Sequence, residues 1–156
     1  MIFHVKTVYN IYKEGRGKLP KMKPSRELLE KYINELDIDV KINQFNLKEV
    51  QLSLPGIKHK WAGRLIRHKI DLNDLNLKRN QKINEITSQI EHQSPTPLPK
   101  LVIEKTAVKH PLIVEIDTEI TYIKLTIDLL EKTEKTLSSM TFDISNIVKI
   151  ITIETT

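Results

Sequence analysis

The chain has 156 residues, a length typical of one domain, of which 39% are hydrophobic and 29% are charged, with a net charge of +5. It has no cysteine, which excludes disulfides, thiolate metal sites and cysteine nucleophiles and favours a reducing, cytoplasmic setting. No apolar run approaches the ~20 residues that span a bilayer, so we expect no membrane partner.

Residues 1–25 are predicted to be a loosely ordered basic arm. They mix apolar, basic, glycine and proline positions without a sustained period, and six basic residues face one acidic residue. Gly17-Lys18 resembles the end of a phosphate loop, but Leu19 follows where the motif needs Ser or Thr, and the motif's first glycine is missing. We therefore expect no ATP site.

Residues 26–156 are predicted to form a single helical domain that begins with a short helix. Ser25 is a plausible N-cap, and Arg26 and Glu30 form an i,i+4 pair. The helix should end near Asp37. Asp37 and Asp39 have the character of solvated turn charges rather than of a catalytic pair.

The next element is a long helix. A helical pattern extends from about Asn46 to Gln93, with Pro55-Gly56 as its one strong interruption. Because proline lacks a backbone donor and glycine lowers helix propensity, we expect the helix over about 55–93.

This long helix carries the candidate nucleic-acid site. Residues 57–82 contain eight basic and two acidic residues. On a helix, Lys60, Arg64 and Arg67 share one stripe and Trp61 lies beside it. Cations that neutralise phosphates next to a ring that stacks on bases are typical of sequence-independent single-strand binding. The candidate nucleic-acid-binding residues are Lys58, Lys60, Trp61, Arg64, Arg67, Lys69, Lys78, Arg79 and Lys82.

Trp61 and the basic stripe each have a structural alternative. Trp61 is in phase with the apolar seam of Leu65 and Leu72, so a place in the core is favoured over stacking by about two to one. The Lys and Arg residues could merely solvate the outer face. For them binding is favoured, because Asp71 and Asp74 come after the most basic part of the stripe.

A proline-rich turn separates this helix from the second half of the chain. Residues 94–99 contain three prolines and cannot continue a helix. A short helix is expected over Lys100–Lys109, and His110-Pro111 suits the start of another. The turn therefore predicts a helical hairpin.

A heptad-like pattern then predicts an oligomerisation helix over about 111–140. Its apolar positions follow 3-4 spacing, as in a coiled-coil seam, which indicates either an interface or a core. A second row at Tyr122, Leu125 and Leu129 widens the apolar surface and favours a homo-oligomer. The candidate interface residues are Ile113, Ile116, Ile120, Ile123, Ile127, Leu130 and Leu137. Residues 141–156 are rich in β-branched side chains, and we expect a separate short helix there.

No pattern of a catalytic or metal site is present. The five histidines form no i,i+4 pair, and there is no Gly-x-Ser-x-Gly elbow. We therefore expect neither an enzyme nor a cofactor or metal.

The run from Leu54 to Trp61, the basic helix that follows, the proline-rich turn and the stretch from His110 to Ile144 resemble phage UvsY-type recombination mediators. The resemblance covers roughly residues 26–156. It implies an all-α helical hairpin in a ring-like homo-oligomer, a heptamer, in the cytoplasm of an infected bacterium. The implied partners are single-stranded DNA, a RecA-like recombinase and the single-strand-binding protein.

The resemblance also implies that basic residues of the long helix contact DNA and that the protein is not an enzyme. The family's Lys-x-Arg motif is not matched, because Asn84 and Ile86 stand at the approximate positions. This difference suggests contacts nearer to Trp61. Two alternatives remain: a DNA-packaging subunit, which would prefer duplex DNA, and a structural coiled-coil scaffold, which would bind no nucleic acid.

Overall fold

The computed structural model describes residues 23–155, and in this range the chain forms four helices and no strand. They are α2 (Arg26–Asp39), α3 (Leu47–Gln93), α4 (Lys100–Val108) and α5 (Pro111–Glu154). The predicted all-α fold is confirmed. The predicted basic arm lies outside the described residues except for its last three positions.

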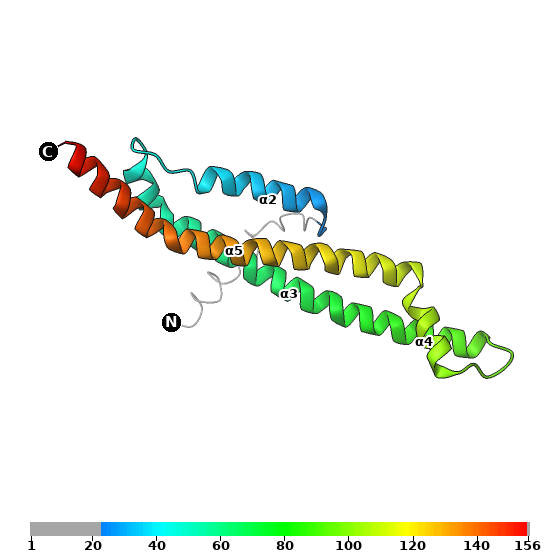
Figure 1. The fold of residues 1–156 in the computed structure, drawn as a ribbon. Coiled ribbons are helices and arrows are strands. Elements are labelled where there is room, and N and C mark those ends of the chain that lie inside the picture. The colour runs from blue at the N-terminus through cyan, green and yellow to red at the C-terminus, as the bar shows by residue number, and fades with distance from the viewer. Residues whose placement is uncertain (1–22, 156) are drawn as a thin grey trace, which may run out of the picture.

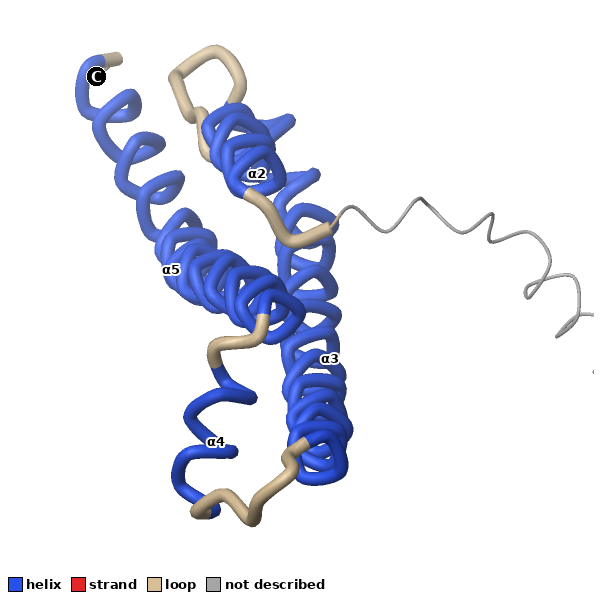
Figure 2. Tube along the Cα trace, turned by 90° about the vertical axis from the view of Figure 1, so that its right-hand side faces the viewer, coloured by secondary structure: helices blue, strands red, loops and turns tan. Residues whose placement is uncertain are grey.

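Two long helices, α3 and α5, form an antiparallel hairpin (Figure 1). The short helix α4 lies at the closed end of the hairpin, between the proline-rich turn and α5. Seen from the side, α2 lies along the outside of the α3–α5 pair (Figure 2). α2 and α3 run in opposite directions, as the colours of Figure 1 show. This arrangement leaves the half of α3 near the closed end without α2 beside it (Figure 1).

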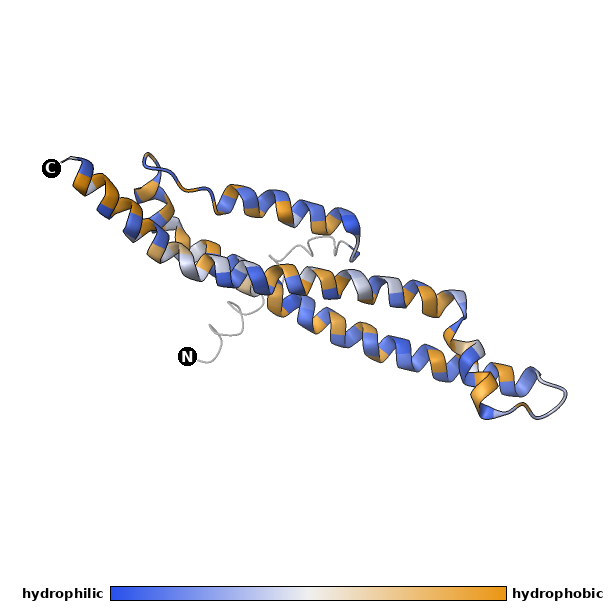
Figure 3. Ribbon diagram, in the orientation of Figure 1, coloured by the Kyte–Doolittle hydropathy of each residue, from blue (hydrophilic) through white to orange (hydrophobic). Residues whose placement is uncertain are grey.

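Hydrophobic residues recur along both α3 and α5 (Figure 3), and the buried ones form the core between the helices. A larger cluster joins Trp61 and Leu65 of α3 to Leu130 and Leu137 of α5, and half-buried side chains of α2 pack against it. Near the closed end a smaller cluster joins α3, α4 and α5 through Ile86, Ala107 and Ile113. Each helix therefore buries one apolar stripe, as the helical periodicity requires.

The predicted start of the long helix is wrong. α3 begins at Leu47, and Pro55 lies inside it. A proline in a helix interior removes one backbone hydrogen bond, but Val50 and Leu54 are both buried on the turns before Pro55. Burial of these side chains against the core outweighs the local preference to start at the proline.

The predicted break near residue 140 is also wrong, because α5 continues to Glu154. Met140 and Ile144 extend the 3-4 spacing of buried positions beyond Leu137. The hydroxyl groups of Thr136, Ser138 and Ser139 donate hydrogen bonds to carbonyls three or four residues earlier in the same helix. The β-branched and hydroxylated sequence is therefore compatible with one continuous helix.

The predicted oligomer interface lies mostly inside a single chain. Six of its seven residues are buried, and the seventh, Ile127, is half-buried against the larger cluster. α3 covers this seam, so it is not available to another subunit. At Thr126 the spacing slips by one residue, and Thr126 and Thr133 take buried positions at which the heptad pattern places no apolar residue.

Among the described helices, none has the length and apolar character needed to cross a bilayer.

Candidate nucleic-acid interface

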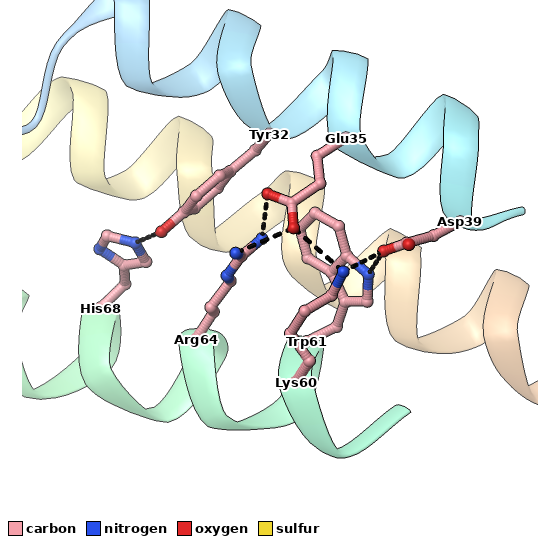
Figure 4. Close-up of polar contacts among 7 residues, drawn as sticks. All are labelled: Tyr32, Glu35, Asp39, Lys60, Trp61, Arg64 and His68. Atoms are coloured by element: carbon pink, nitrogen blue, oxygen red, sulfur yellow. Dashed lines mark hydrogen bonds and ion pairs between the residues drawn. The ribbon is translucent and has the colours of Figure 1, made fainter. Parts of the chain in front are cut away.

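α2 covers the most basic part of α3. Tyr32, Glu35 and Asp39 recur on α2 at a spacing of three and four, which places them on one face of the helix. The helices are antiparallel, so Tyr32 meets His68, Glu35 meets Arg64, and Asp39 meets Lys60 (Figure 4).

Glu35 and Asp39 neutralise two of the predicted DNA-binding cations. Arg64 donates two hydrogen bonds to Glu35, from Nη1 to Oε2 at 2.7 Å and from Nη2 to Oε1 at 3.0 Å (Figure 4). The Lys60 ammonium donates to Oε1 of Glu35 at 3.0 Å and also to Oδ2 of Asp39. Bidentate guanidinium–carboxylate pairs are among the stronger hydrogen-bonded contacts in proteins. In this conformation Lys60 and Arg64 are therefore paired within the chain.

Trp61 lies in the core and is 1% exposed. Its Nε1 donates to Oδ2 of Asp39 at 2.7 Å. The Tyr32 ring packs on it edge to face with centroids 5.7 Å apart, and the Arg64 guanidinium lies 4.7 Å from its ring centroid. The core position that the sequence favours for Trp61 is therefore confirmed, and in this conformation no face of the ring is open to a base.

Asp39 was expected to be a solvated turn charge, and that expectation is wrong. Its side chain is 15% exposed and accepts hydrogen bonds from both Lys60 and Trp61. Sequence reasoning missed Glu35 and Asp39 as members of the site. The available signal was the alignment of Tyr32, Glu35 and Asp39 on one face of a short helix in a chain with a strongly basic partner helix.

Contacts between α2 and α3 form a polar cluster of seven residues: Tyr32, Glu35, Asp39, Lys60, Trp61, Arg64 and His68 (Figure 4). Its surroundings shift the pKa values of Glu35 and Lys60 in the direction that favours ion pairing. Hydrogen bonding to Arg64, followed by Lys60, lowers the pKa of Glu35 to about 2 against the opposing effect of burial. Burial acts to lower the pKa of Lys60, but hydrogen bonds to Asp39 and Glu35 outweigh it and raise that pKa. Both groups therefore remain charged near neutral pH.

His68 closes the cluster at its other end. Its Nε2 lies 3.1 Å from the Tyr32 hydroxyl, and its buried Nδ1 has no hydrogen-bond partner in the described part of the chain. Burial is the main reason that the pKa of His68 is lowered. The imidazole is therefore neutral near pH 7, and it forms part of the contact between α2 and α3.

The other candidate cations divide into paired and unpaired residues. Lys69 bridges to Glu131 at 2.8 Å, Arg79 binds Asp117, and Lys82 pairs with Glu85 within α3. Within residues 23–155, by contrast, Lys58, Arg67 and Lys78 take part in no ion pair, and Arg67 and Lys78 are exposed. These three cations are the members of the predicted set that are free to meet a phosphate without any rearrangement.

An open groove between α3 and α5 offers a different surface. It has a volume of about 690 Å³, and its lining includes Lys69, Lys135, Glu131 and Glu134 as well as the exposed Phe142. The two cations and two carboxylates balance each other, so this groove lacks the positive potential that a phosphate chain requires. The exposed cations of α3 are the better candidates.

Comparisons with known proteins identify the fold. No protein-family model matches the sequence, and no curated protein matches it significantly. Three crystal structures of the bacteriophage T4 recombination mediator protein UvsY are similar to it, in lattice types IV, II and I, with TM-scores of 0.69, 0.68 and 0.66. They are 16–17% identical in sequence, and the matches cover 81–82% of this chain and 98% of theirs. The resemblance seen in the sequence is confirmed as a shared fold.

Proposed function

We propose, from this shared fold, that the chain is a recombination mediator that binds single-stranded DNA and helps to load a RecA-like recombinase onto strands covered by single-strand-binding protein. The observation that carries the proposal is the match to the T4 mediator over 98% of that protein's chain. A mediator needs no catalytic group. Its role is to bind the strand and to change what else is bound there.

The cations of α3 supply a surface suited to this role. Arg67 and Lys78 are separated by eleven residues, which is close to three helical turns, so they lie on the same side of the helix as Lys60 and Arg64. A row of cations on one helix binds phosphates with release of counterions and without reading bases. Such binding suits a protein that acts on strands of any sequence.

The proposal includes assembly of several copies, seven in number. The cations of α3 in each copy would bind the strand weakly, and all copies together would bind it tightly through avidity. The predicted heptad seam is buried by α3, so the interface must use other apolar residues. The C-terminal part of α5 offers such residues, because Phe142, Ile150 and Ile153 are all more than half exposed on this helix. An interface there would leave the cations of α3 free to bind the strand.

The DNA-binding part of the proposal is tested by titrating the full chain against fluorescent single-stranded and duplex oligonucleotides over a salt series. The informative variant is Arg67→Ala/Lys78→Ala, which removes unpaired cations. We expect weaker single-strand binding. The plot of the logarithm of the association constant (log K) against the logarithm of the salt concentration should have a slope shallower by about 1.4, at ~0.7 per lost phosphate contact. Lys124→Ala/Lys149→Ala removes the same charge from exposed positions of α5 and should change the slope much less.

The same titration separates the alternatives. Preference for duplex DNA would indicate a packaging subunit, and an absence of binding would leave a structural scaffold. For the mediator role itself, the measurement is ATP hydrolysis by a RecA-like recombinase on DNA coated with single-strand-binding protein. Addition of this protein should shorten the lag before hydrolysis, and an unchanged lag would contradict the loading role.

A further inference from the structure

The donors beneath α2 form an arrangement that is suited to anions in general. The Lys60 ammonium, the Trp61 indole N–H and the Arg64 guanidinium come from neighbouring positions of α3 and converge on two carboxylates (Figure 4). A DNA phosphodiester presents the same chemistry, a negative charge with two acceptor oxygens. Nothing in this donor set restricts it to carboxylates.

α2 packs along α5, and it contacts α3 mainly through polar side chains. Leu28 is its one buried residue, while Tyr32 and Leu36 are half-buried against the larger cluster. Exposed apolar residues on the same helix include Ile33 and Ile38. A short helix with one buried residue is among the easier parts of a fold to detach, and a polyanion competes directly for the cations that dock α2 on α3.

We propose that Lys60, Trp61 and Arg64 form a phosphate-binding site that Glu35 and Asp39 of α2 fill in the free protein, and that single-stranded DNA occupies the site by displacing α2. The inference rests on the proposed function, because it assumes that the chain binds DNA. It adds a site that is closed in the free protein and an internal competitor that closes it.

The position of this site explains how a strand would reach it. Arg67 is exposed one helical turn beyond Arg64 on the same stripe, next to His68, which Tyr32 of α2 contacts. A strand bound to Arg67 and Lys78 brings its next phosphates close to Glu35 and Asp39. Its effective concentration there is high, so it competes with the carboxylates as a tethered ligand. Displacement of α2 also removes Tyr32 and Asp39 from Trp61, which uncovers the side of the ring that faces α2 and makes it available for stacking.

The first test neutralises the competitor in the full chain with Glu35→Gln/Asp39→Asn. If α2 closes the site, this variant should bind an oligo(dT) strand more tightly than the wild type. Its slope of log K against log salt should be steeper by about 1.4, as two more cations contact phosphates at ~0.7 each. Adding Lys60→Ala/Arg64→Ala to the same variant should abolish both the tighter binding and the steeper slope.

The matched control is Glu27→Gln/Asp37→Asn. Both residues are exposed on α2, and their neutralisation changes the net charge by the same amount without touching the cluster. It should bind DNA with nearly the wild-type slope. Circular dichroism should show that the α3–α5 hairpin stays folded in all variants, with at most the helical signal of the 14 residues of α2 lost, so that a change in affinity reports the site and not the fold.

The second test uses Trp61, the single tryptophan of the chain, as a probe of α2. In the wild type its fluorescence should be protected from acrylamide. It should become accessible in Glu35→Gln/Asp39→Asn without DNA, and the wild-type emission should change when oligo(dT) binds.

The outcomes separate this inference from the proposed function. If the wild type binds DNA but the cluster variant matches its control and Trp61 stays protected, α2 is a fixed part of the fold and the inference is overturned alone. If neither the wild type nor the cluster variant binds DNA, both proposals fail.

Discussion

At the scale of single residues, Trp61 combines apolar burial with one polar contact. Its ring belongs to the larger cluster, and its indole N–H satisfies a carboxylate at the edge of that cluster. This combination is typical of buried tryptophan, whose ring is apolar but whose nitrogen needs an acceptor. The residue therefore links the core to the polar contact with α2.

We expect Trp61→Ala to lower the free energy of unfolding by about 3–5 kcal/mol, because it leaves a large cavity. The control is Phe45→Ala, since Phe45 is 87% exposed and its loss should cost less than about 0.5 kcal/mol. Urea denaturation measures both. Equal stability of Trp61→Ala and the wild type would contradict the buried position.

The docking of α2 should weaken as the pH falls. Because burial lowers the pKa of His68 in the folded protein, the neutral imidazole contributes fully to the free energy of unfolding above pH 6.5, its ordinary pKa. This contribution decreases as the pH falls below 6.5. The lowered pKa of Glu35 adds a second loss between 4.5 and about 2. In urea titrations at a series of pH values, Glu35→Gln should lack the second loss. A stability that is flat from pH 7 to pH 3 would be inconsistent with both shifts.

At the scale of helices, two prolines illustrate opposite effects of position. Pro55 lies inside α3, where a donor is missing, whereas Pro111 lies at the start of α5, where no intrahelical donor is needed. We expect Pro55→Ala to raise the free energy of unfolding by about 1–3 kcal/mol. Pro111→Ala should leave it unchanged or lower it by less than about 1 kcal/mol. Thermal unfolding checks the pair, and a destabilised Pro55→Ala variant would show that α3 needs its proline.

At the scale of the whole molecule, the long hairpin is a fold that buries its seam within one chain. Ile123 is 1% exposed between α3 and α5. Ile123→Ala should lower the free energy of unfolding by about 2–5 kcal/mol and leave the mass of the native species unchanged in sedimentation. A change of mass with unchanged stability per chain would show instead that the seam is an interface between subunits. Leu125→Ala, at a half-exposed position of the same helix, is the control.

The helical class, the hairpin turn and the cations of α3 could be predicted from the sequence, because periodicity, proline placement and charge are local properties. The ends of α3 and α5 could not, since burial of Val50, Leu54, Met140 and Ile144 in the core outweighs the local preferences of Pro55 and of the β-branched C-terminal stretch.

Periodicity likewise shows that the α5 seam must be covered, but not whether a helix of the same chain or of another covers it. For the same reason, the sequence shows that Lys60 and Arg64 are basic and Trp61 apolar, while only the tertiary structure shows what they meet. Glu35 and Asp39 lie 21–29 residues away along the chain and reach the cluster only because α2 folds back on α3. Ion pairing depends on distance in space, and that distance was decided by the packing of helices.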